Sequence, residues 1–171
     1  MTASECDPET IKRLLGLEPH PTCGFVAETY RSTVRVPAEV LAGYDGSRPL
    51  GSALHFLVTP EANIRLHRIR SDQQYHHHVG GALDVLLLYP SGDAEVRVVG
   101  SDLLAGERPM LFIPGGTFHV SRLAPGRAWA LLSSTEWPGV EPPDVEPGDP
   151  DALALKFPAM ADEIRSFTST D

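Results

Sequence analysis

The sequence has little cysteine, little lysine and no long apolar run, and each shortage excludes a class of protein. Its two cysteines, Cys6 and Cys23, are too few for a disulfide framework, so we expect a reduced, cytoplasmic protein. Its first residues, MTASECDPET, lack the basic and apolar stretches of a secretory signal peptide. No apolar stretch reaches the length of a membrane span, so we expect no membrane partner.

Positive charge is also scarce. The 14 Lys and Arg residues, only two of them Lys, are scattered along the chain and stand against 23 Asp and Glu residues, for a formal net charge of −9. Nucleic acids and anionic membrane surfaces bind clustered cations. We therefore expect no nucleic acid as a partner.

The spacing of turn residues predicts a mainly β protein. The chain of 171 residues is long enough for one domain, and its 16 prolines and 15 glycines interrupt it every few residues, which favours short strands over long helices. Helices are predicted only near the two ends. The first is capped by Asp7 and stops at Gly16, the second begins at Asp149-Pro150, and a third turn or helix follows Pro158.

Between these ends, eight short apolar and β-branched runs read as strands, with a hairpin joining the fourth to the fifth. So many strands in one small domain predict a sandwich or small barrel over about residues 24–136. Residues 137–171 are then an irregular acidic, Pro-rich strap and the closing helices. The eight runs are SALHFLV, NIRLHRI, QYHHHV, LDVLLLY, AEVRVV, MLFI, FHVSRL and AWALLSS.

Histidines gather in and around these runs. His67 ends the second run and precedes Gln73 by six residues, and SDQQYHHHVGG carries three consecutive histidines. Downstream, the segment PGGTFH places Pro114, Gly116 and His119 in a Pro-x-Gly-x-x-His arrangement. A turn held by Pro and Gly is a rigid way to aim the imidazole that follows it.

These motifs resemble those of the cupin superfamily, and the chain from about residue 11 to residue 167 resembles its Cupin_5 family. The segments that carry the likeness are LGLEPHP, ETYRS, HRIRSDQQYHH, LLAGERPMLFIPGGTF, WPGVEPPDVE and FPAMADEIRSF. The resemblance implies a jelly-roll β-barrel of the cupin type, commonly a homodimer, with its site inside the barrel mouth.

The sequence departs from the general cupin pattern at two of the four usual metal-ligand positions. Ile69 stands where the second histidine is expected, and Gln73 stands where the glutamate is expected. His67 and His119 keep the other two positions. The resemblance therefore implies a reduced ligand set.

Strand alternation predicts which side chains share the interior. The motif acid of cupins faces into the barrel, so Gln73 is expected to face inward, and Tyr75 and His77 follow it in phase. With His67 and His119 they form the predicted interior set. A β-bulge at the start of this strand would turn His76 and His78 inward instead.

One hypothesis is a divalent metal site formed by His67, His119 and Gln73, with His77 or His55 as a third imidazole. Imidazole suits Fe, Zn, Ni and Cu, and such a site would support a metal-dependent oxygenase. The alternative is a barrel without metal, in which the same histidines are acid–base groups or only hydrogen-bond.

The leading hypothesis is proton transfer on a small-molecule substrate by an isomerase, epimerase, cyclase or lyase of specialised biosynthesis, because several titratable groups converge in one cavity. His77 or His119 would be the base and Tyr75 the partner acid. A non-catalytic binding protein is the third hypothesis.

The predicted substrate-binding residues are Gln73, Glu28, Tyr30 and His55. Glu28 and Tyr30 are expected to share one face of a strand, with Arg31 on the other face. Cys23 is expected to be inert.

Overall fold

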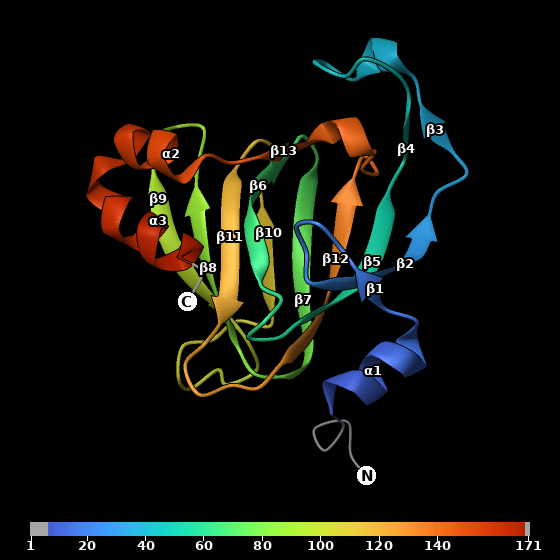
Figure 1. Ribbon diagram of the computed structural model, residues 1–171. Coiled ribbons are helices and arrows are strands. Elements are labelled where there is room, and N and C mark those ends of the chain that lie inside the picture. The colour runs from blue at the N-terminus through green and yellow to red at the C-terminus, as the bar shows by residue number, and fades with distance from the viewer. Residues whose placement is uncertain (1–6, 170–171) are drawn as a thin grey trace.

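Two antiparallel β-sheets face each other in the computed structural model, which describes residues 7–169 (Figure 1). Sheet A has six strands in the order β1-β2-β5-β12-β7-β10, and sheet B has five in the order β13-β6-β11-β8-β9. A separate pair, β3 and β4, projects beyond one end of the barrel (Figure 1). The strands span Glu18–Pro19 (β1), Phe25–Arg31 (β2), Arg35–Val36 (β3), Arg48–Pro49 (β4), Ser52–Val58 (β5), Ile64–Ile69 (β6), Asp72–Gly80 (β7), Leu83–Leu88 (β8), Ala94–Val99 (β9), Met110–Ile113 (β10), Phe118–Leu123 (β11), Ala130–Trp137 (β12) and Val145–Pro147 (β13).

β8 of sheet B is buried on both faces, which explains its long apolar run. In β8, Leu83, Val85 and Leu87 face sheet A in the barrel core. Leu86 and Leu88 point the other way, under the C-terminal helices. Those helices, α2 (Pro150–Lys156) and α3 (Ala161–Thr168), lie against the outer face of sheet B (Figure 1). A strand covered on both faces cannot alternate apolar with polar residues, because both sets of side chains leave water.

The first helix begins and ends at the predicted residues, the second begins where predicted, and a 3-10 turn and α3 follow Pro158 as predicted. In α1 (Pro8–Leu15), the Asp7 carboxylate accepts from the backbone N–H of Thr10 at 3.0 Å, and Gly16 closes the helix in the left-handed conformation at φ +63°. In α2, Asp149 caps the backbone N–H of Ala152 at 3.2 Å. These helices and the two sheets confirm the predicted jelly-roll class.

The strap after β12 is more regular than predicted. Its 3-10 turn η3 (Pro142–Asp144) leads into β13, which pairs with β6 and adds a strand to sheet B. The Arg48 guanidinium fixes the turn by binding both carboxylate oxygens of Asp144, at 2.7 and 2.8 Å. The strap is therefore part of the barrel wall. Two further 3-10 turns, η2 (Ala38–Val40) and η4 (Pro158–Met160), lie outside the barrel strands.

The helices of residues 7–169 include none that is long and apolar enough to cross a membrane. Cys6 and the residues before it lie outside the described residues, and they include most of the segment from which we expect no signal peptide. The hairpin predicted between LDVLLLY and AEVRVV is confirmed as β8 and β9, which pair in an unbroken antiparallel register.

Gly24 is required where the chain enters the barrel. Its φ is +66°, and an added Cβ would lie 2.5 Å from the Leu57 carbonyl oxygen and 2.8 Å from that of Ala62. Gly16 has a similar φ of +63°, but an added Cβ would meet no atom within 4 Å. A side chain at either glycine would therefore meet the same backbone strain, but only at Gly24 would its Cβ also clash with neighbouring atoms.

We expect Gly16→Ala to cost about 1 kcal/mol of unfolding free energy from backbone strain alone. Gly24→Ala adds a clash with two backbone carbonyls, and we expect it to cost about 1–2 kcal/mol more than the Gly16 variant. Urea unfolding of both variants measures the difference. Equal losses in the two variants would show that the close approach at Gly24 has no energetic consequence.

Candidate active site

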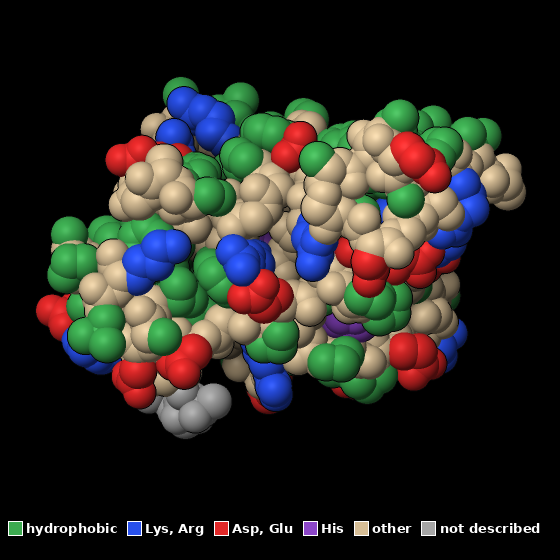
Figure 2. Space-filling model, turned by 90° about the horizontal axis from the view of Figure 1, so that it is seen from above, with side chains coloured by type: hydrophobic (Ala, Val, Ile, Leu, Met, Phe, Trp, Pro, Cys, Tyr) green, Lys and Arg blue, Asp and Glu red, His purple; other side chains and the backbone are tan. Residues whose placement is uncertain are grey.

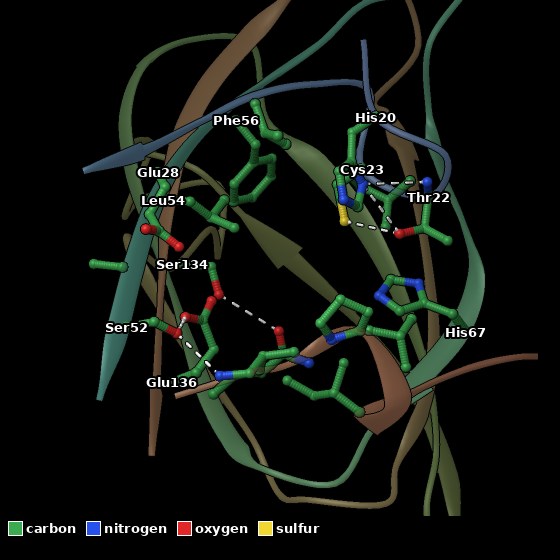
Figure 3. A pocket seen from close by; sticks show the side chains of 18 of the residues that line it. His20, Thr22, Cys23, Glu28, Ser52, Leu54, Phe56, His67, Ser134 and Glu136 are labelled. Atoms are coloured by element: carbon green, nitrogen blue, oxygen red, sulfur yellow. Dashed lines mark hydrogen bonds between the residues drawn. The ribbon is translucent and has the colours of Figure 1, made fainter. Parts of the chain in front are cut away.

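A cavity of about 400 Å³ opens at one end of the barrel. Its walls come from β2, β5, β12 and β7 of sheet A on one side and from β6 of sheet B on the other. The loop at residues 20–23 and the strap at residues 140–145 close it. Its volume lies within the range of small-molecule sites. Figure 3 shows His67 and the 20–23 loop on one side of the cavity and Glu136, Ser52 and Ser134 on the other.

His67 and His119 lie on neighbouring strands of sheet B with their ring centroids 4.3 Å apart. The Nδ1 atom of His67 donates to the Arg65 carbonyl oxygen at 2.7 Å, because a carbonyl can only accept. A neutral His67 therefore carries its lone pair on Nε2. Burial lowers the pKa of His67 below its usual value, which keeps the ring neutral near pH 7. His67 lines the cavity, whereas His119 is fully buried behind it.

Gln73 occupies the remaining lone pair of His119. The His119 Nδ1 atom lies 3.3 Å from the Thr117 carbonyl oxygen, which leaves Nε2 as an acceptor. The Gln73 side-chain Nε2 lies 3.4 Å from that atom and donates to it. Sequence reasoning thus identified three residues that the fold brings together, and an amide N–H points at the atom that a metal would need.

The donor set does not fit a resident transition metal. Two imidazoles and a neutral amide fall short of the three good protein ligands of a usual catalytic site, since Ile69 and Gln73 replace a histidine and a carboxylate. Within residues 7–169, no group of three His, Cys, Asp or Glu side chains could hold a metal ion. The predicted third imidazole is absent from the cavity, because neither His77 nor His55 lines it.

His77 was predicted to face the cavity, and the structure places it elsewhere. His77 pairs with Leu132 and so keeps the phase of Gln73 and Tyr75, because the register shift that makes His78 the extra residue comes after it. The cavity lining on β7 reaches only Gln73 and Tyr75, and the His77 Nε2 atom instead lies 3.0 Å from the Gly81 carbonyl oxygen. His77 is therefore not positioned to contact a ligand there.

His55 was predicted to bind substrate, but it points to the outer face of sheet A. Its neighbours Leu54 and Phe56 both line the cavity, and strand alternation turns His55 away. Its ring packs edge-on against that of His78 at 5.6 Å. His76 lies on the same outer face, where its Nε2 atom is 3.1 Å from the Thr135 hydroxyl.

Tyr75 lies in the cavity wall, in phase with Gln73 as predicted. Its ring packs 4.9 Å from that of Phe56 and 6.0 Å from that of His119. Burial raises the pKa of Tyr75 well above its usual value. The phenol therefore keeps its proton and can donate a hydrogen bond.

A bulge in β2 separates residues that were predicted to lie together. The pairing with β5 shifts register between Glu28 and Tyr30, which leaves Thr29 unpaired. Glu28 and Arg31 consequently both line the cavity, joined by an Nη2–Oε2 contact of 2.6 Å. Tyr30 is 58% exposed and lies outside the cavity, which removes it from the predicted binding set.

Sequence reasoning missed Glu136, the buried carboxylate of the cavity. Glu136 is only 3% exposed, and the Ser52 hydroxyl donates to its Oε2 atom at 2.6 Å. Burial raises its pKa, against the opposing effect of hydrogen bonds from Ser134 and Ser52. Alternation along β12 could have revealed it, because Glu136 is in phase with the buried Leu132 and with Ser134.

Cys23 and His20 lie at the cavity edge in the 20–23 loop (Figure 3). Burial raises the pKa of the Cys23 thiol to about 11, so it is not a thiolate near neutral pH. That state agrees with the predicted inert cysteine. Burial also lowers the pKa of His20 and favours its neutral form.

The raised pKa of Glu136 predicts a pH-dependent stability. The unfolded chain ionises this carboxyl at lower pH than the folded protein does, so its contribution is greatest below its unfolded pKa and is lost as pH rises through its folded pKa. We expect the unfolding free energy of wild type minus that of Glu136→Gln to fall as pH rises from about 4 to about 8. Urea unfolding across this range measures it. A flat or rising difference would show that burial does not raise the pKa of Glu136.

The comparisons agree with this architecture. The family model described as Cupin_5, Cupin superfamily (DUF985), matches residues 9–147. The chain is 28% identical over 146 residues to the uncharacterized protein YML079W of Saccharomyces cerevisiae, covering 78% of this chain and 73% of the yeast protein.

Solved structures show the same fold. A hypothetical protein from Leishmania major, 24% identical, superimposes with a TM-score of 0.85 over 96% of this chain and 100% of its own. Oxalate decarboxylase from Bacillus subtilis shares the fold alone, with 14% identity and a TM-score of 0.52 over 88% of this chain and 36% of its own. With the family model matching most of its length, this chain belongs to the Cupin_5 family of the cupin superfamily.

Proposed function

We propose that this cupin is a small-molecule enzyme that works by proton transfer, of the isomerase, epimerase, cyclase or lyase type. One observation carries the proposal: a neutral imidazole and a buried carboxyl line opposite walls of one cavity (Figure 3). Titratable groups with perturbed pKa values in a cavity are typical of acid–base sites. An acid and a base on opposite sides of a bound molecule can remove a proton at one face and return one at the other.

In this proposal His67 is the base. Its Nδ1–H is held by the Arg65 carbonyl oxygen, which orients the Nε2 lone pair and fixes the tautomer. His119 packs against the His67 ring and holds it in position. His119 is not itself the base, because its own Nε2 atom accepts a hydrogen bond from Gln73. This assigns the base to His67 in place of the predicted His77 or His119.

Glu136 is the partner acid. Its raised pKa extends the pH range over which the carboxyl holds a proton, and the Ser52 hydroxyl fixes its orientation at 2.6 Å. Tyr75 remains protonated and supplies a hydrogen bond to an oxygen of the substrate as charge develops there. Leu54 and Phe56 form an apolar wall that limits water around the reacting atoms.

Proton exchange with solvent tests this function before the substrate is known. The protein is incubated in D₂O with aldoses, ketoses, lactones, amino ketones and 2-oxo acids, and mass spectrometry detects deuterium gained at carbon. We expect exchange into at least one compound, reduced at least about 100-fold by His67→Gln and by Glu136→Gln. Ser133→Ala, on the outer face of sheet A, is the matched control and should exchange as wild type does.

Exchange that survives both cavity variants would remove His67 and Glu136 as the acid and base. Saturable binding of a compound without exchange in any of them would support a non-catalytic binding protein instead. These outcomes separate the two classes of function.

We also propose a homodimer formed through the outer face of sheet A. The cupin resemblance supports it, as do Met110 and Phe112, which project from β10 on this face and are 51% and 52% exposed. Light scattering should give twice the chain mass for wild type and the chain mass for Phe112→Asp. A monomeric wild-type protein at cellular concentration would refute the dimer.

The partner that we propose is a small molecule, and neither nucleic acid nor a membrane. The net charge of −9 repels polyanions, and basic side chains lie among acidic ones on the face shown in Figure 2. The free thiol of Cys23 supports a reducing compartment, and we propose the cytoplasm.

A further inference from the structure

The cavity lining carries three carboxylates and one cation. Its charged side chains are Glu28, Arg31, Glu136 and Glu141. No lysine lines the cavity, so Arg31 is the one formal positive charge available to a ligand among its described lining residues. The formal charge of the lining is therefore negative whether or not Glu136 is protonated, because Glu28 and Glu141 still outnumber Arg31.

The positive charge of Arg31 is already engaged. Its Nε and Nη2 atoms donate to the same Glu28 oxygen at 2.9 and 2.6 Å. Its Nη1 atom donates to the Val140 carbonyl oxygen at 3.2 Å and lies 3.6 Å from a Glu141 carboxylate oxygen. A ligand anion would have to displace one of these carboxylates to bind the guanidinium.

The two lining imidazoles add no cation near neutral pH, because burial lowers the pKa of both His20 and His67. The remaining polar groups are hydrogen-bond partners without charge, such as the Tyr75 phenol and the Ser134 hydroxyl. These groups suit hydroxyl, carbonyl and amine groups of a ligand.

We propose that this cavity selects an uncharged or cationic small molecule and rejects carboxylates and phosphates, and that Glu136 binds the polar group of the ligand. The proposal rests on the proposed function only in using the same cavity. Glu136 accepts from an ammonium group in its ionised form, which the positive charge of such a ligand favours, and in either protonation state it exchanges hydrogen bonds with a hydroxyl. A ligand carboxylate at the same place would face Glu136 in a poorly solvated site, with Glu28 and Glu141 nearby and no free cation to offset them.

Three probes with one ring and different charge test this selection. Benzylamine, benzyl alcohol and benzoate are cationic, neutral and anionic at a pH of about 7. Each is titrated into methyl-labelled wild-type protein, and NMR follows the signals of Leu54 and Val26, which line the cavity. We expect the amine and the alcohol to bind saturably and benzoate to bind at least about 10-fold more weakly than the amine. Raising NaCl from about 20 to about 300 mM should reduce the difference in affinity between benzylamine and benzoate.

Glu136→Gln should weaken the binding of benzylamine at least about 5-fold and change the affinity for benzyl alcohol by no more than about 2-fold. The control is Glu146→Gln, because Glu146 is exposed on β13 and lies outside the cavity lining. Benzoate binding as tightly as benzylamine, or an absence of saturable binding by both the amine and the alcohol, would overturn the proposal. If the binding order of the three probes is not as expected, the deuterium-exchange result is unaffected. If no deuterium exchange is found, the binding order is unaffected, so the proposed charge selection and the proposed function can be refuted separately.

Discussion

Gln73→Glu is expected to bind Co(II) at least about 100-fold more tightly than wild type, a gain of about 2.7 kcal/mol. The substitution replaces an amide with a carboxylate beside two imidazoles whose rings are 4.3 Å apart. It also removes the N–H that occupies the His119 Nε2 lone pair at 3.4 Å. Two imidazoles and one carboxylate form a ligand set that suits divalent transition metals.

Co(II) titration followed by visible absorption and by calorimetry measures this gain, and neither depends on a substrate. Without metal, the variant buries a new carboxylate, and we expect its melting temperature to fall and to recover when Co(II) is added. Asn63→Asp is the matched control, because it also replaces an amide with a carboxylate, at an exposed residue next to β6. Stoichiometric, tight Co(II) binding by wild type that is lost in His67→Ala would show that Gln73 does not prevent metal binding.

Arg48→Ala is expected to cost about 3–5 kcal/mol of unfolding free energy, because it leaves a buried carboxylate without its partner. The Asp144 side chain is fully buried, and Arg48 binds both of its oxygens, at 2.7 and 2.8 Å. Asp144 also accepts from the backbone N–H of Glu141 at 3.0 Å and so shapes the turn of the strap. Urea unfolding at neutral pH measures the loss.

The control for this ion pair is Arg35→Ala. Arg35 lies on β3 and is half-exposed, and its nearest carboxylate oxygen, on Glu141, is 3.6 Å away. Exposed pairs of this kind contribute about 0–1 kcal/mol. Since Val140, Glu141 and Val145 line the cavity, Arg48→Ala should also weaken benzylamine, whereas Arg35→Ala should not. Similar stability losses in the two variants would contradict a special role for the buried pair.

Most of the fold was predictable because the local signals agree with the tertiary structure. The run SALHFLV coincides with β5, and Asp7 and Gly16 cap α1 as predicted. Both cases depend on residues within one turn or one strand. The strap was less predictable, since its Pro-rich composition gives no sign that β13 pairs with β6.

The site was only partly predictable from strand alternation. Alternation placed Gln73 and Tyr75 in the cavity wall, but it could not show that the cavity lining ends before His77, the next residue in phase on β7. A bulge at Thr29 brings Arg31 to the cavity. No residue type at Thr29 indicates a bulge, so sequence alone could not locate it.

The orientations of His55 and Glu136, by contrast, could have been predicted from the sequence. Leu54 and Phe56 flank His55 in an apolar strand, and their inward direction already turns His55 outward. Glu136 follows Leu132 and Ser134 in phase along β12. An acidic residue on the inner face of a barrel strand is a strong signal of a functional group.

The central claim is that His67 and Glu136 form an acid–base pair across one cavity. NMR titration of ¹³C-labelled wild-type protein tests it most directly, with signals assigned by His67→Gln and Glu136→Gln. The account predicts that Glu136 titrates above its usual pKa of 4.5 and that His67 titrates below 6.5, with the proton of its neutral form on Nδ1. A Glu136 pKa at or below 4.5, or a His67 that is protonated at neutral pH, would contradict it.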